Sequence, residues 1–167
     1  MNLHLKEGAD LISATNSYLN QNPVEHIDVV VAPPAYQLVQ SSQLSGNVKL
    51  SVSAQNMAAQ DNGAFTGELS ASMVKDAGAE LVIIGHSERR EIFGEQDDLL
   101  KQKLHKAIDS GLYPIFCVGE SLEQRKNGEH FKHIENQLKA GLSDFSSEQL
   151  PNIIVAYEPI WAIGTGE

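Results

Sequence analysis

Residues 81–90 read Leu81-Val82-Ile83-Ile84-Gly85-His86-Ser87-Glu88-Arg89-Arg90, so that four consecutive apolar residues lead into a glycine, a histidine and a cluster of charge. A run that is apolar at every position is typical of a strand buried on both faces, as in parallel sheets. Gly85 allows the backbone to turn, which places His86 at the carboxyl end of the strand. Because α/β sheets and barrels carry their chemistry at that edge, the stretch predicts a parallel sheet with a candidate site at His86.

The rest of the chain alternates strands and helices in the same manner. Strands are expected at 27–32, 48–54, 81–84, 113–118 and 152–157, and helices at 6–19, after 33–34, at 70–77, at 99–110 and at 129–142. Strands that alternate with helices need crossover connections, which predict a parallel sheet. No low-complexity linker interrupts the pattern, so a single domain over residues 1–167 is expected.

Apolar spacing also predicts which side chains face the interior. The expected inward residues are Tyr36, Leu38, Val39 and Leu44 in the helix after residues 33–34, Leu100, Leu104 and Ile108 in the next long helix, and Phe131, Ile134, Leu138 and Leu142 in the helix at 129–142. Phe65 lies in the glycine-rich loop 61–68, where water would surround it. We therefore expect Phe65 to dock against another surface.

Composition limits the class of partner and the compartment. Twelve basic and 22 acidic residues give a formal net charge of −10, which argues against nucleic acid or an anionic membrane as the main partner but allows a small anionic ligand. The one cysteine, Cys117, cannot form an internal disulfide, and no apolar run approaches the ~20 residues of a membrane span. A cytoplasmic location is expected.

Polar residues follow several of the predicted strands. Gln55-Asn56, His86, Glu120 and Glu158 each come directly after an apolar or alternating segment. The carboxyl ends of parallel strands meet at one edge of a sheet, so these groups are expected to converge there.

His86 and Glu158 are the candidate acid–base pair. If a helical turn begins at Ser87, its free N–H groups face the imidazole and favour its neutral form. Pro159 holds Glu158 extended, and the flanking Tyr157, Ile160 and Trp161 are expected to shield the carboxylate in part, as a general base needs. The competing interpretations are a histidine satisfied by a backbone partner and an ordinary surface glutamate.

Three other features carry weaker signals. The segment 160–166 ends in Gly164-Thr165-Gly166, which is either a mobile lid whose amides reach an anion or a plain surface turn. His130 and His133 share a helix face, but no further ligand completes a metal site. Cys117 lies in an apolar run and is expected in the core rather than as a nucleophile.

At these residues the chain resembles the triosephosphate isomerase family along its whole length. The matching segments are Val31-Ala32-Pro33-Pro34, Ala54-Gln55-Asn56, Gly63-Ala64-Phe65-Thr66-Gly67-Glu68, Ile84-Gly85-His86-Ser87-Glu88-Arg89-Arg90, Cys117-Val118-Gly119-Glu120 and Ala156-Tyr157-Glu158-Pro159-Ile160-Trp161-Ala162-Ile163-Gly164-Thr165-Gly166. The resemblance implies a (β/α)8 barrel of the α/β class. It also implies interconversion of dihydroxyacetone phosphate and D-glyceraldehyde 3-phosphate, with no metal and no cofactor.

The resemblance also implies individual roles. Glu158 would be the base and His86 the electrophile, with Ser87 and Glu88 in support, Glu88 by pairing with the family's lysine. The amide of Gly164 would hold the substrate phosphate under a closed lid. Thr66 and Phe65 would insert into a second subunit of a homodimer.

The chain departs from the family pattern at both ends. The family's Asn-Trp-Lys motif is absent before Met1-Asn2, Lys6 is in the wrong place to replace its lysine, and the chain stops at Glu167. We therefore expect an incomplete barrel of about five of eight parallel strands, a fragment of the parent enzyme that is itself inactive. The alternative is a non-catalytic truncated barrel that acts as a binding or assembly module.

Overall fold

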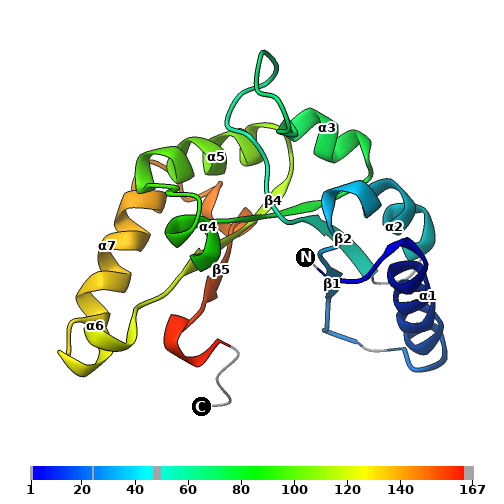
Figure 1. Ribbon diagram of the computed structural model, residues 1–167, viewed down its shortest axis with the longest axis horizontal. Helices are drawn as coiled ribbons and strands as arrows, with labels where there is room; N and C mark the ends of the chain where they lie inside the picture. The colour runs from blue at the N-terminus through cyan, green and yellow to red at the C-terminus, as the bar shows by residue number, and fades with distance from the viewer. Residues whose placement is uncertain (1, 24, 47–49, 164–167) are drawn as a thin grey trace. The chain divides into compact units, whose positions relative to one another are not determined.

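The computed structural model describes residues 2–23, 25–46 and 50–163, and all five predicted strands are found there (Figure 1). They are β1 (Val29–Val31), β2 (Leu50–Ala54), β3 (Leu81–Ile84), β4 (Tyr113–Val118) and β5 (Ile154–Tyr157). The strands follow one another in sheet order β1-β2-β3-β4-β5, and β1 with β2, β2 with β3 and β4 with β5 are parallel pairs. Sequential parallel strands that alternate with helices are the repeat of the (β/α)8 barrel, of which five strands are described here.

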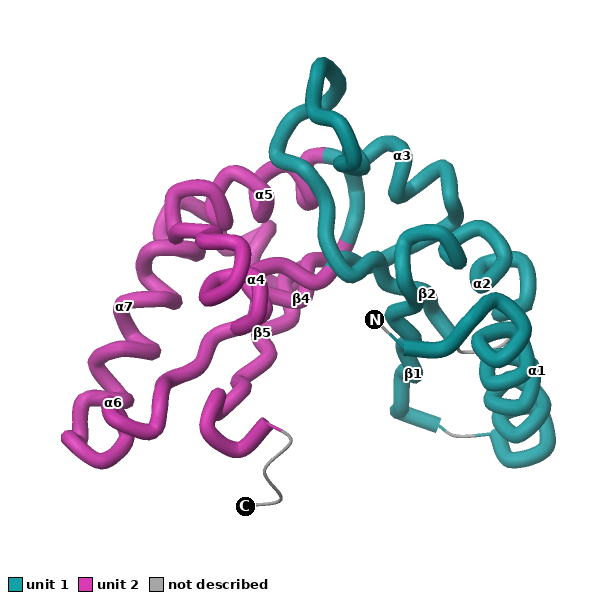
Figure 2. The backbone as a smooth tube through the Cα atoms, viewed as in Figure 1, with its two compact units in different colours: residues 1–82, 110–112 teal, residues 83–109, 113–167 magenta. Residues whose placement is uncertain are grey.

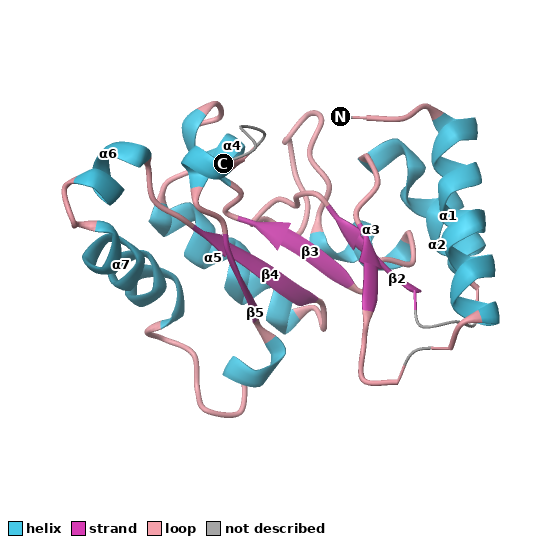
Figure 3. Ribbon diagram, turned by 90° about the horizontal axis from the view of Figure 1, so that it is seen from below, coloured by secondary structure: helices cyan, strands magenta, loops and turns pink. Residues whose placement is uncertain are grey.

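Helix α1 precedes β1, and the other α-helices lie in the connections between the strands (Figure 3). The α-helices are α1 (Leu5–Gln21), α2 (Leu38–Ser45), α3 (Ala71–Asp76), α4 (Ser87–Glu91), α5 (Asp97–Asp109), α6 (Leu122–Lys126) and α7 (His130–Leu142), and short 3-10 turns span Ala35–Gln37, Leu150–Asn152 and Ile160–Ala162. The sequence pattern did not predict α6. This helix has only five residues, too few to show a helical stripe, and it begins at a Ser121 cap that accepts from Gln124 N–H.

The chain divides into two compact units, residues 1–82 with 110–112 and residues 83–109 with 113–167 (Figure 2). In the first unit, β1 pairs with β2 in the register Val29–Leu50, and α2 packs on β2. In the second unit, β4 pairs with β5 in the register Ile115–Ile154, and α5 and α7 pack against β4. The single domain expected from the sequence stays a prediction.

The core of the second unit forms around Phe116 of β4. Leu100 and Leu104 of α5 are fully buried, as their spacing predicted, and Ile108 is half-buried. Gly141 lets α7 pack directly against the Phe116 ring, because a Cβ at this position would meet the ring at 2.6 Å. This packing fixes the strand whose carboxyl end carries Gly119 and Glu120.

The predicted inner face of α2 is wrong for Tyr36 and Val39, which are 60% and 56% exposed. The chain enters α2 through a 3-10 turn, which rotates the buried face onto Gln37, Leu38, Ser41 and Ser45. The buried Gln37 side chain has a hydrogen-bond partner there, because its Nε2 donates to Leu3 O at 3.0 Å. Apolar spacing alone missed this polar stripe.

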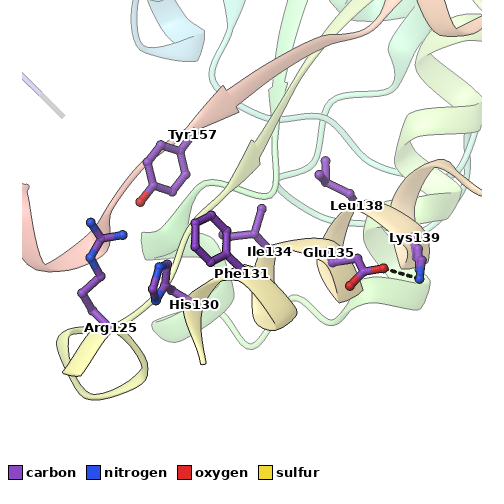
Figure 4. Close-up of a pocket in the computed structure, with 8 residues that line it drawn as sticks. All are labelled: Arg125, His130, Phe131, Ile134, Glu135, Leu138, Lys139 and Tyr157. Carbon is purple, nitrogen blue, oxygen red and sulfur yellow. Dashed lines mark hydrogen bonds and ion pairs between the residues drawn. The ribbon is translucent and has the colours of Figure 1, made fainter. Parts of the chain in front are cut away.

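The predicted inward position of Phe131 in α7 is also wrong, since its side chain is 80% exposed. Instead α7 buries Gln137 and Gly141. Phe131, Ile134 and Leu138 line an open apolar groove of about 570 Å³ together with Tyr157 of β5 (Figure 4). Charged groups from Arg125, Glu135 and Lys139 also line this groove, which does not include His86 or Glu158.

Candidate active site

The sharp turn at Gly85 positions His86. Gly85 has φ +79°, and a Cβ there would come within 3.2 Å of the Cys117 carbonyl. His86 is the N-cap of α4, and the Glu88 N–H donates to His86 Nδ1 at 3.3 Å. The predicted helical turn at Ser87 is therefore confirmed. Because Nδ1 accepts a hydrogen bond, the proton of the neutral imidazole lies on Nε2.

Glu158 lies opposite this nitrogen. Its backbone N–H donates to Val118 O at 2.8 Å, which continues the β4–β5 ladder by one residue. Its Oε1 lies 3.6 Å from His86 Nε2, with 30% of the histidine and 23% of the glutamate side chain exposed. Glu158 Oε2 is buried and has no hydrogen-bond partner among the described residues. The two predicted groups are thus neighbours, and each of the two side chains is partly exposed.

Glu120 joins this edge as a structural carboxylate. It is fully buried, and its Oε1 accepts from Tyr157 Oη and Trp161 Nε1, both at 3.1 Å. Burial by itself raises the pKa of Glu120, but these two donors and the nearby Arg125 outweigh it and hold the pKa below its ordinary value. Tyr157 and Trp161, which were expected to shield Glu158, both donate to Glu120.

Arg90 also contacts this edge of the sheet, at the carboxyl ends of β3 and β4. Its Nε donates to Gly85 O at 2.8 Å and its Nη2 to Cys117 O at 3.2 Å, while Nη1 pairs with Asp97 at 2.8 Å. The guanidinium therefore ties together the ends of β3 and β4. In the sequence, Arg90 looks like one member of an exposed charge cluster, so its role was not predicted.

A buried charge cluster connects α4, α5 and the loop between them. Glu95 Oε1 accepts from Arg89 Nε at 2.7 Å and from Lys103 Nζ at 2.6 Å. Glu95 is 6% exposed and Lys103 only 3%. The sequence analysis did not predict this cluster, because Glu95 lies outside α5 and nothing in the helical pattern links it to Lys103.

The remaining predicted site residues lie at several places. Ser87 is buried, and Glu88 is 73% exposed with its Oε2 3.7 Å from His86 Nδ1. Thr66 and Phe65 are exposed in the loop of the first unit. Lys6 lies in the first turn of α1, 3.9 Å from Asp10. Gly164 lies outside the described residues.

The described residues offer neither a metal site nor a membrane-spanning helix. No group of three or more histidine, cysteine, aspartate or glutamate side chains there is placed to hold a metal ion. His133 Nδ1 lies 3.0 Å from Gln124 Nε2 instead. None of the described helices has the length and apolar character to cross a membrane.

Cys117 is expected to make the protein less stable at alkaline pH. Burial and the neighbouring Glu158 carboxylate raise the pKa of its thiol from 9.0 to about 12. The fold therefore favours the protonated thiol, a contribution that is complete below pH 9 and lost as the pH rises toward 12. The free energy of unfolding of the wild type should fall between pH 7 and pH 10. The fall should be about 1 kcal/mol smaller in the Cys117→Ala variant, which has no thiol to ionise. Urea unfolding at both pH values measures this, and equal losses in the two proteins would contradict it.

Comparison with known proteins agrees with this geometry. The family model described as triosephosphate isomerase matches residues 1–167. A triosephosphate isomerase of Alkaliphilus oremlandii is 44% identical over the whole chain and 66% of its own length, and one of Alkaliphilus metalliredigens is 41% identical over 97% of the chain and 65% of its own length. One from Trichlorobacter lovleyi is 47% identical over 86% of the chain and 57% of its own length. The chain thus spans about two thirds or less of these relatives, and it belongs to the triosephosphate isomerase family.

Proposed function

We propose that the protein containing this chain is an isomerase that interconverts dihydroxyacetone phosphate and D-glyceraldehyde 3-phosphate. The observation that carries the proposal is the 3.6 Å separation of His86 Nε2 and Glu158 Oε1, which places a carboxylate and an imidazole beside one another. Both lie in the second unit at the carboxyl ends of β3 and β5. The named relatives are isomerases of this kind and support the reaction class.

In this mechanism Glu158 removes a proton from the carbon next to the substrate carbonyl. The electron pair of the broken C–H bond forms a carbon–carbon double bond, and the carbonyl π electrons move to oxygen, which gives an enediolate. His86 Nε2–H donates a hydrogen bond to the developing oxyanion. Glu158 then returns the proton to the neighbouring carbon, while His86 assists proton exchange between the two oxygens.

The other predicted residues have supporting roles in the proposal. Glu88 holds the imidazole in the required tautomer, because its N–H donates to Nδ1, and buried Ser87 begins the helix that carries this donor. The Gly164 amide binds the substrate phosphate. No metal or cofactor takes part, since a proton transfer with an oxyanion donor needs none.

The direct test is interconversion of the two triose phosphates by the purified full-length protein. NMR of the substrate mixture follows both directions without a coupling enzyme. We expect both directions to reach the same equilibrium mixture. A folded protein that converts neither triose phosphate would refute the proposed activity and favour the non-catalytic binding module.

We also propose that the full-length protein is a homodimer in which loop 61–68 docks into a second copy. Phe65 is 45% exposed at the loop, where a buried site on a partner would stabilise it. Docking can bury only the exposed part of Phe65, so Phe65→Ser removes roughly half of the 1.5–3 kcal/mol of a full burial from each of two symmetric contacts, and the dimer dissociation constant should rise about 10- to 10²-fold.

Sedimentation velocity over a range of protein concentrations measures that constant. The matched control is Tyr18→Ser, which removes another exposed aromatic side chain of the same unit, 64% exposed on α1. We expect the control to keep the wild-type dissociation constant. A monomeric wild type, or a Phe65→Ser variant that dimerises as tightly as the control, would contradict the proposed interface.

A further inference from the structure

We propose that Gln137 is a positioning residue, which holds the base Glu158 in place through the peptide of Gly119. The inference rests on the proposed isomerase function, because it assigns Glu158 the role of base. Gln137 belongs to α7, and its Oε1 accepts from the Gly119 N–H rather than from His86 or Glu158.

The first link is a buried hydrogen bond. The Gly119 N–H donates to Gln137 Oε1 at 3.0 Å, and Gln137 is 7% exposed. Residues 116–120 are all buried, so water cannot replace this acceptor. A buried N–H without an acceptor is costly, and the strand end would shift to find another partner. Gln137 therefore fixes the orientation of the Gly119 peptide.

The second link is the contact between Gly119 and the backbone of Glu158. A Cβ at Gly119 would overlap the Glu158 carbonyl oxygen, so the two backbones lie against one another. Hydrogen bonds hold this contact on both sides, from Glu158 N to Val118 O at 2.8 Å and from Ile160 N to Glu120 O at 3.1 Å. Any movement of the Gly119 peptide is therefore transmitted to the backbone that carries the base.

The consequence concerns the position of the carboxylate relative to His86. The side chain of Glu158 extends from the backbone atoms that rest on Gly119, and its Oε1 lies 3.6 Å from His86 Nε2. Misplacement of a catalytic group by about 1 Å costs about 10²-fold in rate. A displacement of this size slows proton abstraction and leaves the phosphate contacts of the substrate in place, so kcat should fall while KM stays nearly constant.

Three variants of the full-length protein test the proposal. Gln137→Met has nearly the same length but no acceptor, and should lower kcat about 10-fold or more with a KM change below about twofold. Gln137→Glu keeps an oxygen acceptor and should recover kcat to within about threefold of the wild type. The matched control is Leu138→Ala, the next residue of α7, which weakens apolar packing but leaves the Gly119 N–H bonded and should keep kcat.

The results separate positioning from simple stability. Urea unfolding shows how much each variant loses, and an equal loss of kcat in Leu138→Ala and Gln137→Met at equal destabilisation would overturn the proposal. A wild-type kcat in Gln137→Met would overturn it as well. If Gln137→Met does not fold, hydrogen exchange of the Gly119 amide in the wild type decides: slow exchange is expected, and exchange at the rate of an unbonded amide refutes the link. An inactive wild type would instead refute the proposed function.

Discussion

Replacing Glu158 by glutamine should lower the kcat/KM of the full-length protein by about 10²- to 10⁴-fold, the usual contribution of a general base. The amide has the same shape but cannot accept a proton from carbon. Glu158 is 23% exposed, and its neighbour His86 Nε2 lies 3.6 Å away, so the substitution changes the chemistry without removing packing. Steady-state kinetics in both directions measures the effect, and most of it should appear in kcat.

One further active-site variant and one control accompany this prediction. His86→Gln should lower kcat by a similar order, since it removes the Nε2–H donor to the oxyanion. Glu91→Gln changes an exposed carboxylate at the end of the same helix that begins after His86, and should keep the wild-type kcat. Turnover by Glu158→Gln at the rate of Glu91→Gln would remove Glu158 from the mechanism.

Replacing Glu95 by leucine should lower the free energy of unfolding by about 3–5 kcal/mol, because it breaks a buried ion pair on one side only. Lys103 is 3% exposed and loses the carboxylate that it contacts at 2.6 Å, and Arg89 loses its 2.7 Å contact. The buried Lys103 ammonium then has one carboxylate fewer to offset the cost of its burial. Urea unfolding followed by circular dichroism measures the change.

The double variant Glu95→Leu/Lys103→Met distinguishes a buried charge from a packing defect. Replacement of both partners by apolar side chains is often close to neutral, so the double variant should be more stable than Glu95→Leu alone. The exposed pair Glu135–Lys139 is the control, and Glu135→Leu should leave the free energy of unfolding close to that of the wild type. A double variant less stable than Glu95→Leu would contradict the account of this cluster.

The sequence was sufficient to predict the strands and the proximity of His86 and Glu158, because both follow from local patterns. The apolar run at 81–84 and the turn at Gly85 are encoded by neighbouring residues, and parallel strands place their carboxyl ends at one edge. The β4–β5 pairing and the His86–Glu158 distance confirm that reasoning for the second unit.

The supporting residues could not be predicted in the same way. Gln137 and Lys103 are polar residues on helices, and a helical pattern assigns such residues to the solvated face by default. Their burial depends on partners outside their own helices, such as the Gly119 N–H for Gln137 and Glu95 for Lys103. Phe131 was misplaced for the converse reason, since apolar character says that a side chain gains by burial but not that a surface is present to bury it.

The most direct test of the proton-transfer account is conversion of dihydroxyacetone phosphate in D₂O, with the product analysed by NMR. A carboxyl group that holds the abstracted proton exchanges it with solvent before returning it. The account therefore predicts deuterium on the carbon of D-glyceraldehyde 3-phosphate that receives the proton, and no such product within the same time from Glu158→Gln. A product that retains only hydrogen at that carbon, or equal deuterium incorporation by Glu158→Gln, would contradict the role of Glu158 as the base.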